Sequence, residues 1–286
     1  MLLFVDQLTN VDFSYLDPVR GLLGETYLAN IRLKGALDEQ GMVCDFGKVK
    51  KQCRAWLDDE LDHRLAVPAQ SPHLSLEDLE TEYRLEGRFG DGEVLKTRCP
   101  KDAIALVDTD RLTPESIASW CISQLKALFP TSVDQLDLDF SIETIDGASY
   151  HYSHGLKKHL GNCQRIAHGH RSRLDIWIDN EKAPQVEQDW AKKWCDIYIG
   201  TREDIRAEFS ENGIDYLHFT YRSQQGEFEL ILPKQRCYLI DTDSTVELIA
   251  THFANETAKQ FPGKQIKVKA FEGINKGAIA EALLER

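Results

Sequence analysis

One pattern occurs twice in this sequence, as YRLEGRFGDGEVLKTRCPKDAIALVDTDRLTPESIASWC at residues 83–121 and as YLHFTYRSQQGEFELILPKQRCYLIDTDSTVELIATHF at residues 216–253. Tyr83 aligns with Tyr216, and Asp108-Thr109-Asp110 aligns with Asp241-Thr242-Asp243, both at an offset of 133 residues. The offsets of matching residues stay between 132 and 134 over almost forty residues, which chance similarity does not produce. We therefore infer a tandem duplication.

Each copy predicts a mixed unit of strands and helices. Asp91-Gly92 and Gln225-Gly226 lie between strand-like segments, as the loops of β-hairpins do. Thr113-Pro114-Glu115 predicts the start of a helix, and alternating apolar residues over 136–142 and 266–270 predict a strand after the helix of each copy. The fold class is therefore α+β, with an antiparallel sheet covered by helices on one face.

The copies extend upstream of these segments. Gly24-Glu25 aligns with Gly169-His170 at an offset of 145 residues, which falls to 133 further along the chain. The second copy therefore lacks 12 residues, about the length of the stretch 57–68 in the first copy. We divide the chain into a first unit at 1–147 and a second unit at 148–286.

The composition is that of an ordinary soluble globular chain with an acidic surface. Its 286 residues include 34 Lys and Arg against 47 Asp and Glu, and this net charge of −13 repels phosphate backbones, so we expect no nucleic-acid partner. Apolar runs such as Ala103–Val107 are too short to span a membrane, and Met1–Asp6 lacks the basic start of a signal peptide. Seven Cys residues in no paired spacing predict reduced thiols in the cytoplasm.

Histidines are concentrated at the start of the second unit, where five of the nine lie between residues 151 and 170. His168 and His170 are two positions apart on a predicted strand, so their rings project from one face. His154 would complete three neutral imidazoles around an open fourth position, the pattern of a catalytic zinc site. His151 and His159 are competing third ligands, and a solvated His-rich loop is the alternative interpretation.

Two further motifs can carry proton transfer. Cys163 lies five residues before His168, where a nearby cation would favour its thiolate; the alternative is a small buried apolar residue. Asp62-His63 follows a helix predicted from about Phe46 to Leu61, and an Asp beside a His orients the ring and tunes its pKa. The dipeptide alone is weak evidence, because a His at a helix end commonly serves only the helix dipole.

Four glutamates occupy matching positions in the two copies: Glu115 and Glu247 at helix starts, and Glu143 and Glu272 at the final strands. Carboxylates in a first helical turn usually only stabilise the helix dipole, but a carboxylate can also accept two parallel N–H bonds from a guanidine-like heterocycle. Residues 150–174 hold five Lys and Arg and no Asp or Glu, which favours an anionic ligand near the histidines.

At these residues the sequence resembles the family of 6-pyruvoyl-tetrahydropterin synthase and 6-carboxytetrahydropterin synthase. The second unit supplies the family's early His, Cys and HGH strand as His154, Cys163 and His168-Gly169-His170. The first unit supplies the remaining motifs, which are Gly41-Met42-Val43-Cys44-Asp45-Phe46, Leu61-Asp62-His63, Pro114-Glu115 and Glu143-Thr144. The resemblance covers nearly the whole chain as two units.

Each unit departs from the family pattern in the half that the other retains. The first unit has Gly24-Glu25 in place of HGH and no matching Cys, and the second has neither the G-M-V-x-D-F turn nor L-D-H. The family adopts the tunnelling fold (T-fold), in which units associate into barrels with active sites between neighbouring units. The resemblance therefore implies two tandem T-fold units, one composite site per pair, formed within a chain or between chains, and a homo-oligomer.

The resemblance also implies a zinc-dependent lyase acting on 7,8-dihydroneopterin triphosphate. Zinc would be held by His154, His168 and His170. Cys163 would abstract the proton, and the relay of protons would use Asp62, His63 and a strand glutamate, preferably Glu143 because it keeps the E-T form. The pterin would be anchored by a glutamate from the set Glu115, Glu247 and Glu272, and the basic segment would steer the triphosphate.

We expect a reaction like that of 6-carboxytetrahydropterin synthase in the queuosine route, in which side-chain cleavage releases acetaldehyde. The first alternative is 6-pyruvoyl-tetrahydropterin synthase activity, with loss of triphosphate and internal redox rearrangement. The others are a non-catalytic zinc- or pterin-binding T-fold protein and an enzyme with a different purine- or pterin-like substrate. The complementary losses favour an enzyme, because decay would be indifferent to which half each copy loses.

Overall fold

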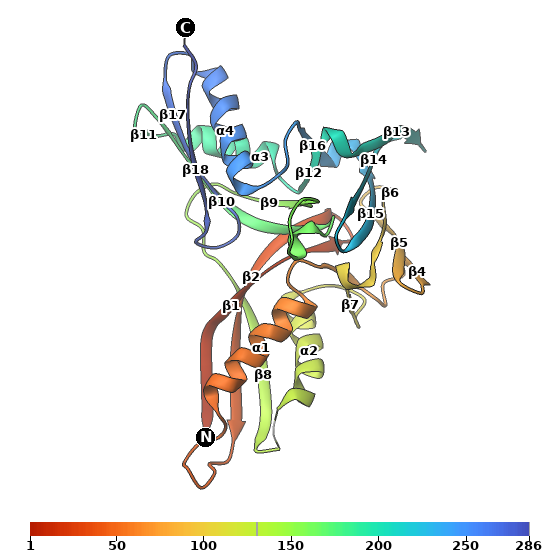
Figure 1. The fold of residues 1–286 in the computed structure, drawn as a ribbon, viewed down its shortest axis with the longest axis vertical. Coiled ribbons are helices and arrows are strands. Elements are labelled where there is room, and N and C mark those ends of the chain that lie inside the picture. The colour runs from red at the N-terminus through yellow and green to blue at the C-terminus, as the bar shows by residue number, and fades with distance from the viewer. Residues whose placement is uncertain (130, 286) are drawn as a thin grey trace.

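The computed structural model describes residues 1–129 and 131–285, which form two α+β units (Figure 1). The first unit has a five-stranded sheet in the order β7-β3-β1-β2-β8. Its elements are β1 (Leu2–Asp17), β2 (Gly21–Gly35), β3 (Leu65–Pro68), β7 (Ile104–Val107), β8 (Val133–Ile142), α1 (Phe46–Glu60) and α2 (Pro114–Leu125). Apolar side chains of both helices and of the sheet form one buried cluster, so the helices cover one face.

The second unit repeats this plan and adds a hairpin strand at the sheet edge. Its strands follow the order β16-β12-β9-β10-β17-β18, with β11 beside β10. Its elements are β9 (Ser149–His154), β10 (His168–Ile178), β11 (Glu181–Lys182), β12 (Ile197–Thr201), β16 (Cys237–Ile240), β17 (Gln265–Phe271), β18 (Gly277–Leu283), α3 (Pro184–Lys193) and α4 (Val246–Gln260). Trp190, Trp194 and Phe253 fill the space between these two helices and the sheet.

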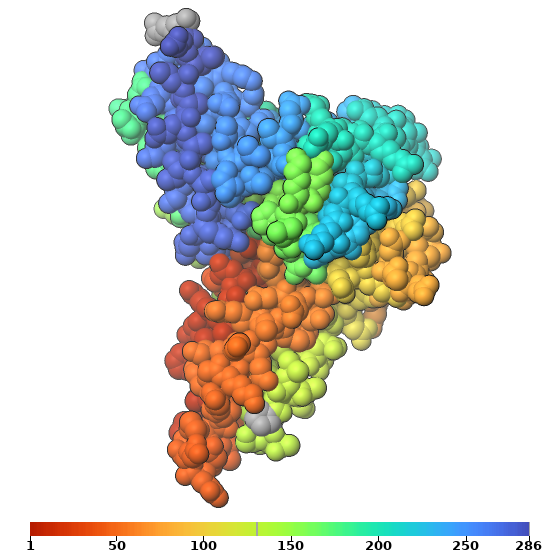
Figure 2. Space-filling model, viewed as in Figure 1, coloured from red at the N-terminus to blue at the C-terminus, as the bar shows by residue number. Residues whose placement is uncertain are grey.

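The repeated hairpins of the two units join in a third sheet of six strands, in the order β13-β14-β15-β6-β5-β4. These strands are β4 (Leu74–Leu79), β5 (Glu82–Phe89), β6 (Glu93–Pro100), β13 (Ile205–Glu211), β14 (Ile214–Ser223) and β15 (Gly226–Pro233). Strand β15 of the second unit pairs with β6 of the first, with Leu230 opposite Thr97. One buried cluster runs beneath both halves of this sheet, and their surfaces adjoin in Figure 2.

The predicted hairpins, helices and final strands are confirmed, but the sheets are not purely antiparallel as expected. Strand β3 runs parallel to β1 and to β7, and β12 runs parallel to β9 and to β16. The reason lies in the connections. After β2 and β10, the helices α1 and α3 carry the chain past β1 and β9 to their far side, so β3 and β12 pair with the strand before last and run parallel to it. None of the helices in the described ranges is long and apolar enough to cross a membrane.

The units cross where two strands touch without side chains between them. A Cβ atom on Gly24 of β2 would lie 1.8 Å from the carbonyl oxygen of Tyr152 and 2.5 Å from the amide nitrogen of His170. A Cβ on Gly169 would lie 2.6 Å from the Cα of Gly24. Beside this crossing, the Ser14 and Ser153 hydroxyls are 2.7 Å apart. Figure 1 shows the β1–β2 and β17–β18 hairpins extending in opposite directions from this region.

We predict that Gly24→Ala lowers the free energy of unfolding by about 3 kcal/mol, because backbone atoms on the facing strand cannot move aside as a side chain can. The matched control is Gly47→Ala in α1, where the nearest atom to an added Cβ is 3.5 Å away, so no loss is expected. Urea unfolding followed by circular dichroism measures both variants. Equal stability of the two would show that the strands do not touch as described.

Candidate metal and acid–base site

Three buried imidazoles meet at the start of β10. His168 and His170 lie on β10, and His154 lies directly opposite His168 in the antiparallel register with β9. The three side chains are at most 1% exposed, and one ring nitrogen from each lies within 4.8 Å of the others. The structure thus groups His154, rather than His151 or His159, with the HGH pair. The Nδ1 of His151 instead contacts the Gly24 carbonyl, and His159 is exposed.

The Nδ1 atom of each ring faces an oxygen. That of His154 lies 3.0 Å from both the carbonyl and the hydroxyl oxygens of Ser244, and that of His168 donates to the Arg165 carbonyl at 2.9 Å. The Nδ1 of His170 lies 3.2 Å from Oδ1 of Asp12 in the first unit. Because a carbonyl oxygen can only accept, Nδ1 of His168 carries the proton, and its Nε2 lone pair is left free.

These imidazoles fit a metal ion. Nε2 of His154 and both ring nitrogens of His170 are buried and have no hydrogen-bond partner in the described part of the chain, and buried polar atoms without partners are rare. Burial, together with the neighbouring imidazoles, lowers the pKa of His154 and His168 well below the usual range, so both rings are neutral. Neutral imidazoles with unused lone pairs are the ligands that zinc takes in catalytic sites.

The acid–base residues stand beside this cluster. His63 follows α1 in the left-handed conformation, with φ 56°, and its Nδ1 contacts the Asp62 carboxylate. Ligand atoms of His63, Cys163 and His168 lie within 4.8 Å of one another. Burial would lower the pKa of His63, but hydrogen bonds with the Asp62 carboxylate and the Cys163 sulfur outweigh it and raise the pKa to about 10.

The two half-sites meet within one chain. Asp62 and His63 belong to the first unit, and Cys163 and His168 belong to the second. The buried guanidinium of Arg165 spans the junction by donating to the Asp62 carbonyl at 3.4 Å. Of the two arrangements left open by the sequence, the structure forms the intrachain one.

The four predicted glutamates are not gathered in one place. Among the described residues, Glu272 is the one of the four whose carboxylate lies within 4 Å of a clustered histidine, with Oε1 3.9 Å from Nε2 of His170. The carbonyl of Glu143 accepts a hydrogen bond from Arg171 at 2.8 Å. Glu115 and Glu247 are exposed in the first turns of α2 and α4. In this chain Glu272, rather than Glu143, therefore stands beside the imidazoles.

The basic segment does not form a free cationic surface. Lys157 pairs with Glu203 and Asp204, and Lys158 pairs with Asp243 at 2.8 Å. The guanidinium of Arg173 stacks over a ring of the same unit, 4.1 Å from its centroid. Acidic residues far away in the sequence therefore compensate the two lysines of this segment, which counting within residues 150–174 could not reveal, whereas Arg165 and Arg171 donate to backbone carbonyls.

Two site residues gave no recognisable signal in the sequence. Asp12 lies in a strand outside every motif, yet its buried carboxylate contacts His170, and Lys276 pairs with its other oxygen at 3.0 Å. Burial would raise the pKa of Asp12, but His170 and Lys276 lower it below the usual range. No local pattern could place Asp12 at the histidines, because the contact depends on the crossing of the two units.

The first unit has no such cluster at the corresponding positions. Tyr15 pairs with Leu23 as His154 pairs with His168, and Glu25 takes the place of His170. Asp196, which follows α3 with φ 56° as His63 follows α1, makes a bidentate ion pair with Arg20 at 2.6 and 2.7 Å. An ion pair between the units therefore occupies the counterpart of the histidine site.

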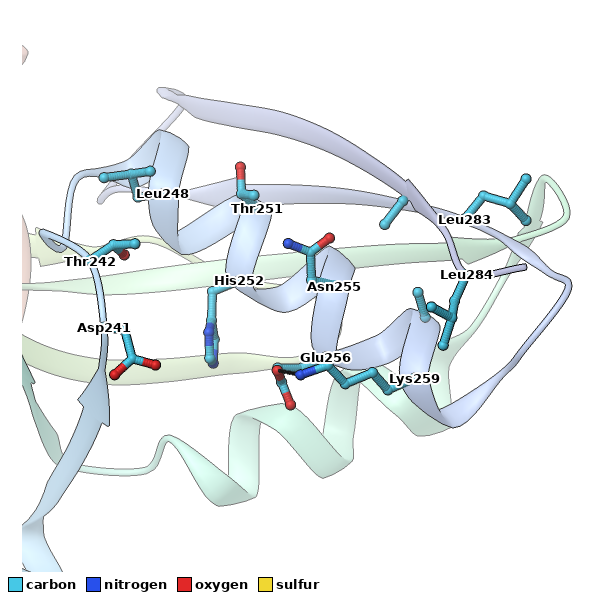
Figure 3. Close-up of a pocket in the computed structure, with 12 residues that line it drawn as sticks. Asp241, Thr242, Leu248, Thr251, His252, Asn255, Glu256, Lys259, Leu283 and Leu284 are labelled. Carbon is cyan, nitrogen blue, oxygen red and sulfur yellow. Dashed lines mark hydrogen bonds and ion pairs between the residues drawn. The ribbon is translucent and has the colours of Figure 1, made fainter. Parts of the chain in front are cut away.

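A surface pocket of about 550 Å³ lies apart from these residues. Figure 3 shows the residues that line it along α4, among them His252, Glu256 and Lys259, together with Leu283, the last residue of β18, and Leu284. None of the predicted site residues lines it. The histidine site is thus defined by its converging ring nitrogens and not by this hollow.

Comparisons with known proteins point to one family. The sequence model of the family described as "6-pyruvoyl tetrahydropterin synthase" matches residues 13–146 and again residues 142–282. A Pyrococcus horikoshii protein provisionally named 6-carboxy-5,6,7,8-tetrahydropterin synthase is 27% identical over 110 residues, which are 38% of this chain and 61% of the relative. The alignment thus spans less than two thirds of that relative.

Solved structures of the same family are also similar. A catalytic-residue mutant of Plasmodium vivax 6-pyruvoyltetrahydropterin synthase matches with a TM-score of 0.39 and 19% identity, over 50% of this chain and 98% of the other. The Plasmodium falciparum enzyme matches with a TM-score of 0.35 and 16% identity, over the same shares. With two matches of the family model along its length, the chain belongs to the 6-pyruvoyl tetrahydropterin synthase family as a tandem pair of T-fold units.

Proposed function

We propose that this chain is a zinc-dependent lyase that acts on 7,8-dihydroneopterin triphosphate, with one composite site per chain. The observation that carries the proposal is the group of buried, unpartnered imidazole nitrogens beside Cys163 and His63. This pairing of a metal-ligand set with an acid–base set suits proton abstraction next to a polarised oxygen. The chain's membership of an enzyme family supports the same conclusion.

The side chains can be given separate tasks. His154, His168 and His170 would hold zinc, which supplies Lewis-acid polarisation of the substrate's side-chain oxygens. Cys163 would act as the base. His63, oriented by Asp62, would return or relay a proton at the sulfur, because its ligand nitrogen lies within 4.8 Å of that atom.

The glutamates would hold the pterin and assist the relay. Glu272 is the candidate from within this site, because its carboxylate lies near His170 and its side chain is partly accessible. Glu143, Glu115 and Glu247 would serve only if neighbouring copies bring them to the site. This supports a homo-oligomer, since Glu115 and Glu247 are exposed and β8 and β18 end their sheets.

We favour the 6-carboxytetrahydropterin product and the queuosine route, because a curated relative carries that name. The 6-pyruvoyl product is the second candidate, which the family description favours. A non-catalytic zinc- or pterin-binding protein is the third. We also propose a unit boundary near 147/148 and a reducing, cytoplasmic compartment, since all seven cysteines are unpaired.

The first experiment incubates the zinc-loaded chain with dihydroneopterin triphosphate, followed by mass analysis of the pterin and an acetaldehyde assay. We expect 6-carboxytetrahydropterin with an equal amount of acetaldehyde. A pyruvoyl product would show that the proposed product is wrong, while the assignment as a lyase acting on dihydroneopterin triphosphate would stand. No conversion by a chain that holds zinc would overturn the lyase proposal.

We predict that the chain binds one zinc ion and that His168→Ala removes it, because His168 is buried between the two other ligands. The matched control is His73→Ala, an exposed histidine of the first unit, which should keep full zinc content. Elemental analysis after dialysis measures both. Two ions per parent chain would contradict the single composite site.

We predict that Cys163→Ala lowers turnover by about 10³-fold while zinc stays bound, because the sulfur supplies the base and not an essential ligand. Cys195→Ala is the control, since that thiol is exposed and outside the site. Steady-state assays with zinc analysis separate the two effects. Parent-like activity in Cys163→Ala would remove this mechanism.

We predict that His63→Ala lowers turnover by about 10²-fold, although the residue belongs to the unit without the histidine cluster. His73→Ala again provides the matched control. If His63→Ala turned over substrate at the parent rate, the two half-sites would not act together in the reaction, even though they lie side by side in the structure.

A further inference from the structure

Asp12 of β1 connects both halves of the site through a single residue. Its side chain reaches the metal half, where Oδ1 lies 3.2 Å from Nδ1 of His170. Its backbone holds the acid–base half, because its amide donates to Oδ1 of Asp62 at 2.7 Å and its carbonyl accepts from the amide of His63 at 2.6 Å. A shift of this strand would therefore move both halves together.

The carboxylate of Asp12 is held in one orientation. Its Oδ1 also accepts a hydrogen bond from the Thr26 hydroxyl at 2.6 Å, and its Oδ2 lies 3.0 Å from the Lys276 ammonium. The residue is only 3% exposed, so water does not compete for these contacts. Each oxygen thus has a fixed partner, and Oδ1 stays directed at His170.

His170 differs from the other two imidazoles in the group that faces its Nδ1 atom. The Nδ1 atoms of His154 and His168 face neutral oxygens of Ser244 and Arg165, whereas that of His170 faces a carboxylate. A carboxylate behind an imidazole fixes the proton on Nδ1, sets the plane of the ring and makes Nε2 a stronger donor to a metal. Asp12 places a carboxylate for this support from the opposite unit, at ion-pair distance from Nδ1 of His170, which has no hydrogen-bond partner among the described residues.

The chain makes room for this carboxylate at Gly273. The residue has φ +68°, and an added Cβ would lie 2.5 Å from Oδ1 of Asp12 and 3.1 Å from the Thr26 hydroxyl. At the matching position of the first unit, after Glu143, the sequence has Thr144. The left-handed backbone and the space that Asp12 occupies both favour glycine at residue 273.

We propose that Asp12 is a positioning residue, contributed by the first unit, that orients His170 for the metal ion and fixes the metal half against Asp62 and His63. This inference rests on the zinc site of the proposed function. It assigns the first unit a part in metal binding as well as in acid–base chemistry.

The test measures the zinc affinity of the full chain by competition with a chromophoric chelator, and the visible spectrum of the cobalt(II)-loaded chain. We expect Asp12→Asn to weaken zinc binding about tenfold and Asp12→Ala about 100-fold, with altered cobalt bands in both. Asp196→Asn is the matched control, because it removes a buried carboxylate of the same interface from the Arg20 ion pair. It should keep the parent affinity and spectrum even if it lowers thermal stability.

A second variant covers failure of the Asp12 variants to fold. Thr26→Val removes the hydroxyl that directs Oδ1, so we expect a several-fold weaker zinc affinity and a shifted cobalt spectrum. If Asp12→Asn or Thr26→Val bound zinc with the parent affinity and spectrum, this inference would be overturned while the zinc site remained. A parent chain that binds no zinc would overturn both.

Discussion

The contact between the backbones of β2 and β10 at Gly24 and Gly169 is the constraint on which the site depends. With no side chain between them, the two strands approach as closely as main-chain atoms allow. This fixes the distance between residues that flank the glycines in either unit. Asp12 thereby meets His170, and His63 meets Cys163, although no local sequence feature links these pairs.

The tandem arrangement also explains why the copies are unequal. Two identical units related by a two-fold axis would carry two identical sites. In one chain the copies mutate separately, so one position can keep His154, His168 and His170 while its counterpart becomes Tyr15, Leu23 and Glu25. The counterpart position is part of the interface, where Arg20 and Asp196 form an ion pair between the units.

Sequence reasoning predicted the elements of each unit better than their relations. Hairpin loops such as Asp91-Gly92 and the helix start at Thr113 depend on a few adjacent residues, so their patterns were sufficient. The parallel outer strands and the joint between β6 and β15 depend on long-range pairing. The position of Glu272 beside His170, and the contact of Asp12 with the same ring, likewise come from the crossing of the units.

Joining both half-sites in one polypeptide changes how the site assembles. Half-sites on separate chains meet only by association, so the fraction of complete sites falls when the protein is dilute. Here Asp62 and Cys163 are tethered, and short tethers give effective concentrations of about millimolar or more. The meeting of Asp62 and His63 with Cys163 and His168 is therefore a unimolecular event, which does not depend on how much protein the cell makes.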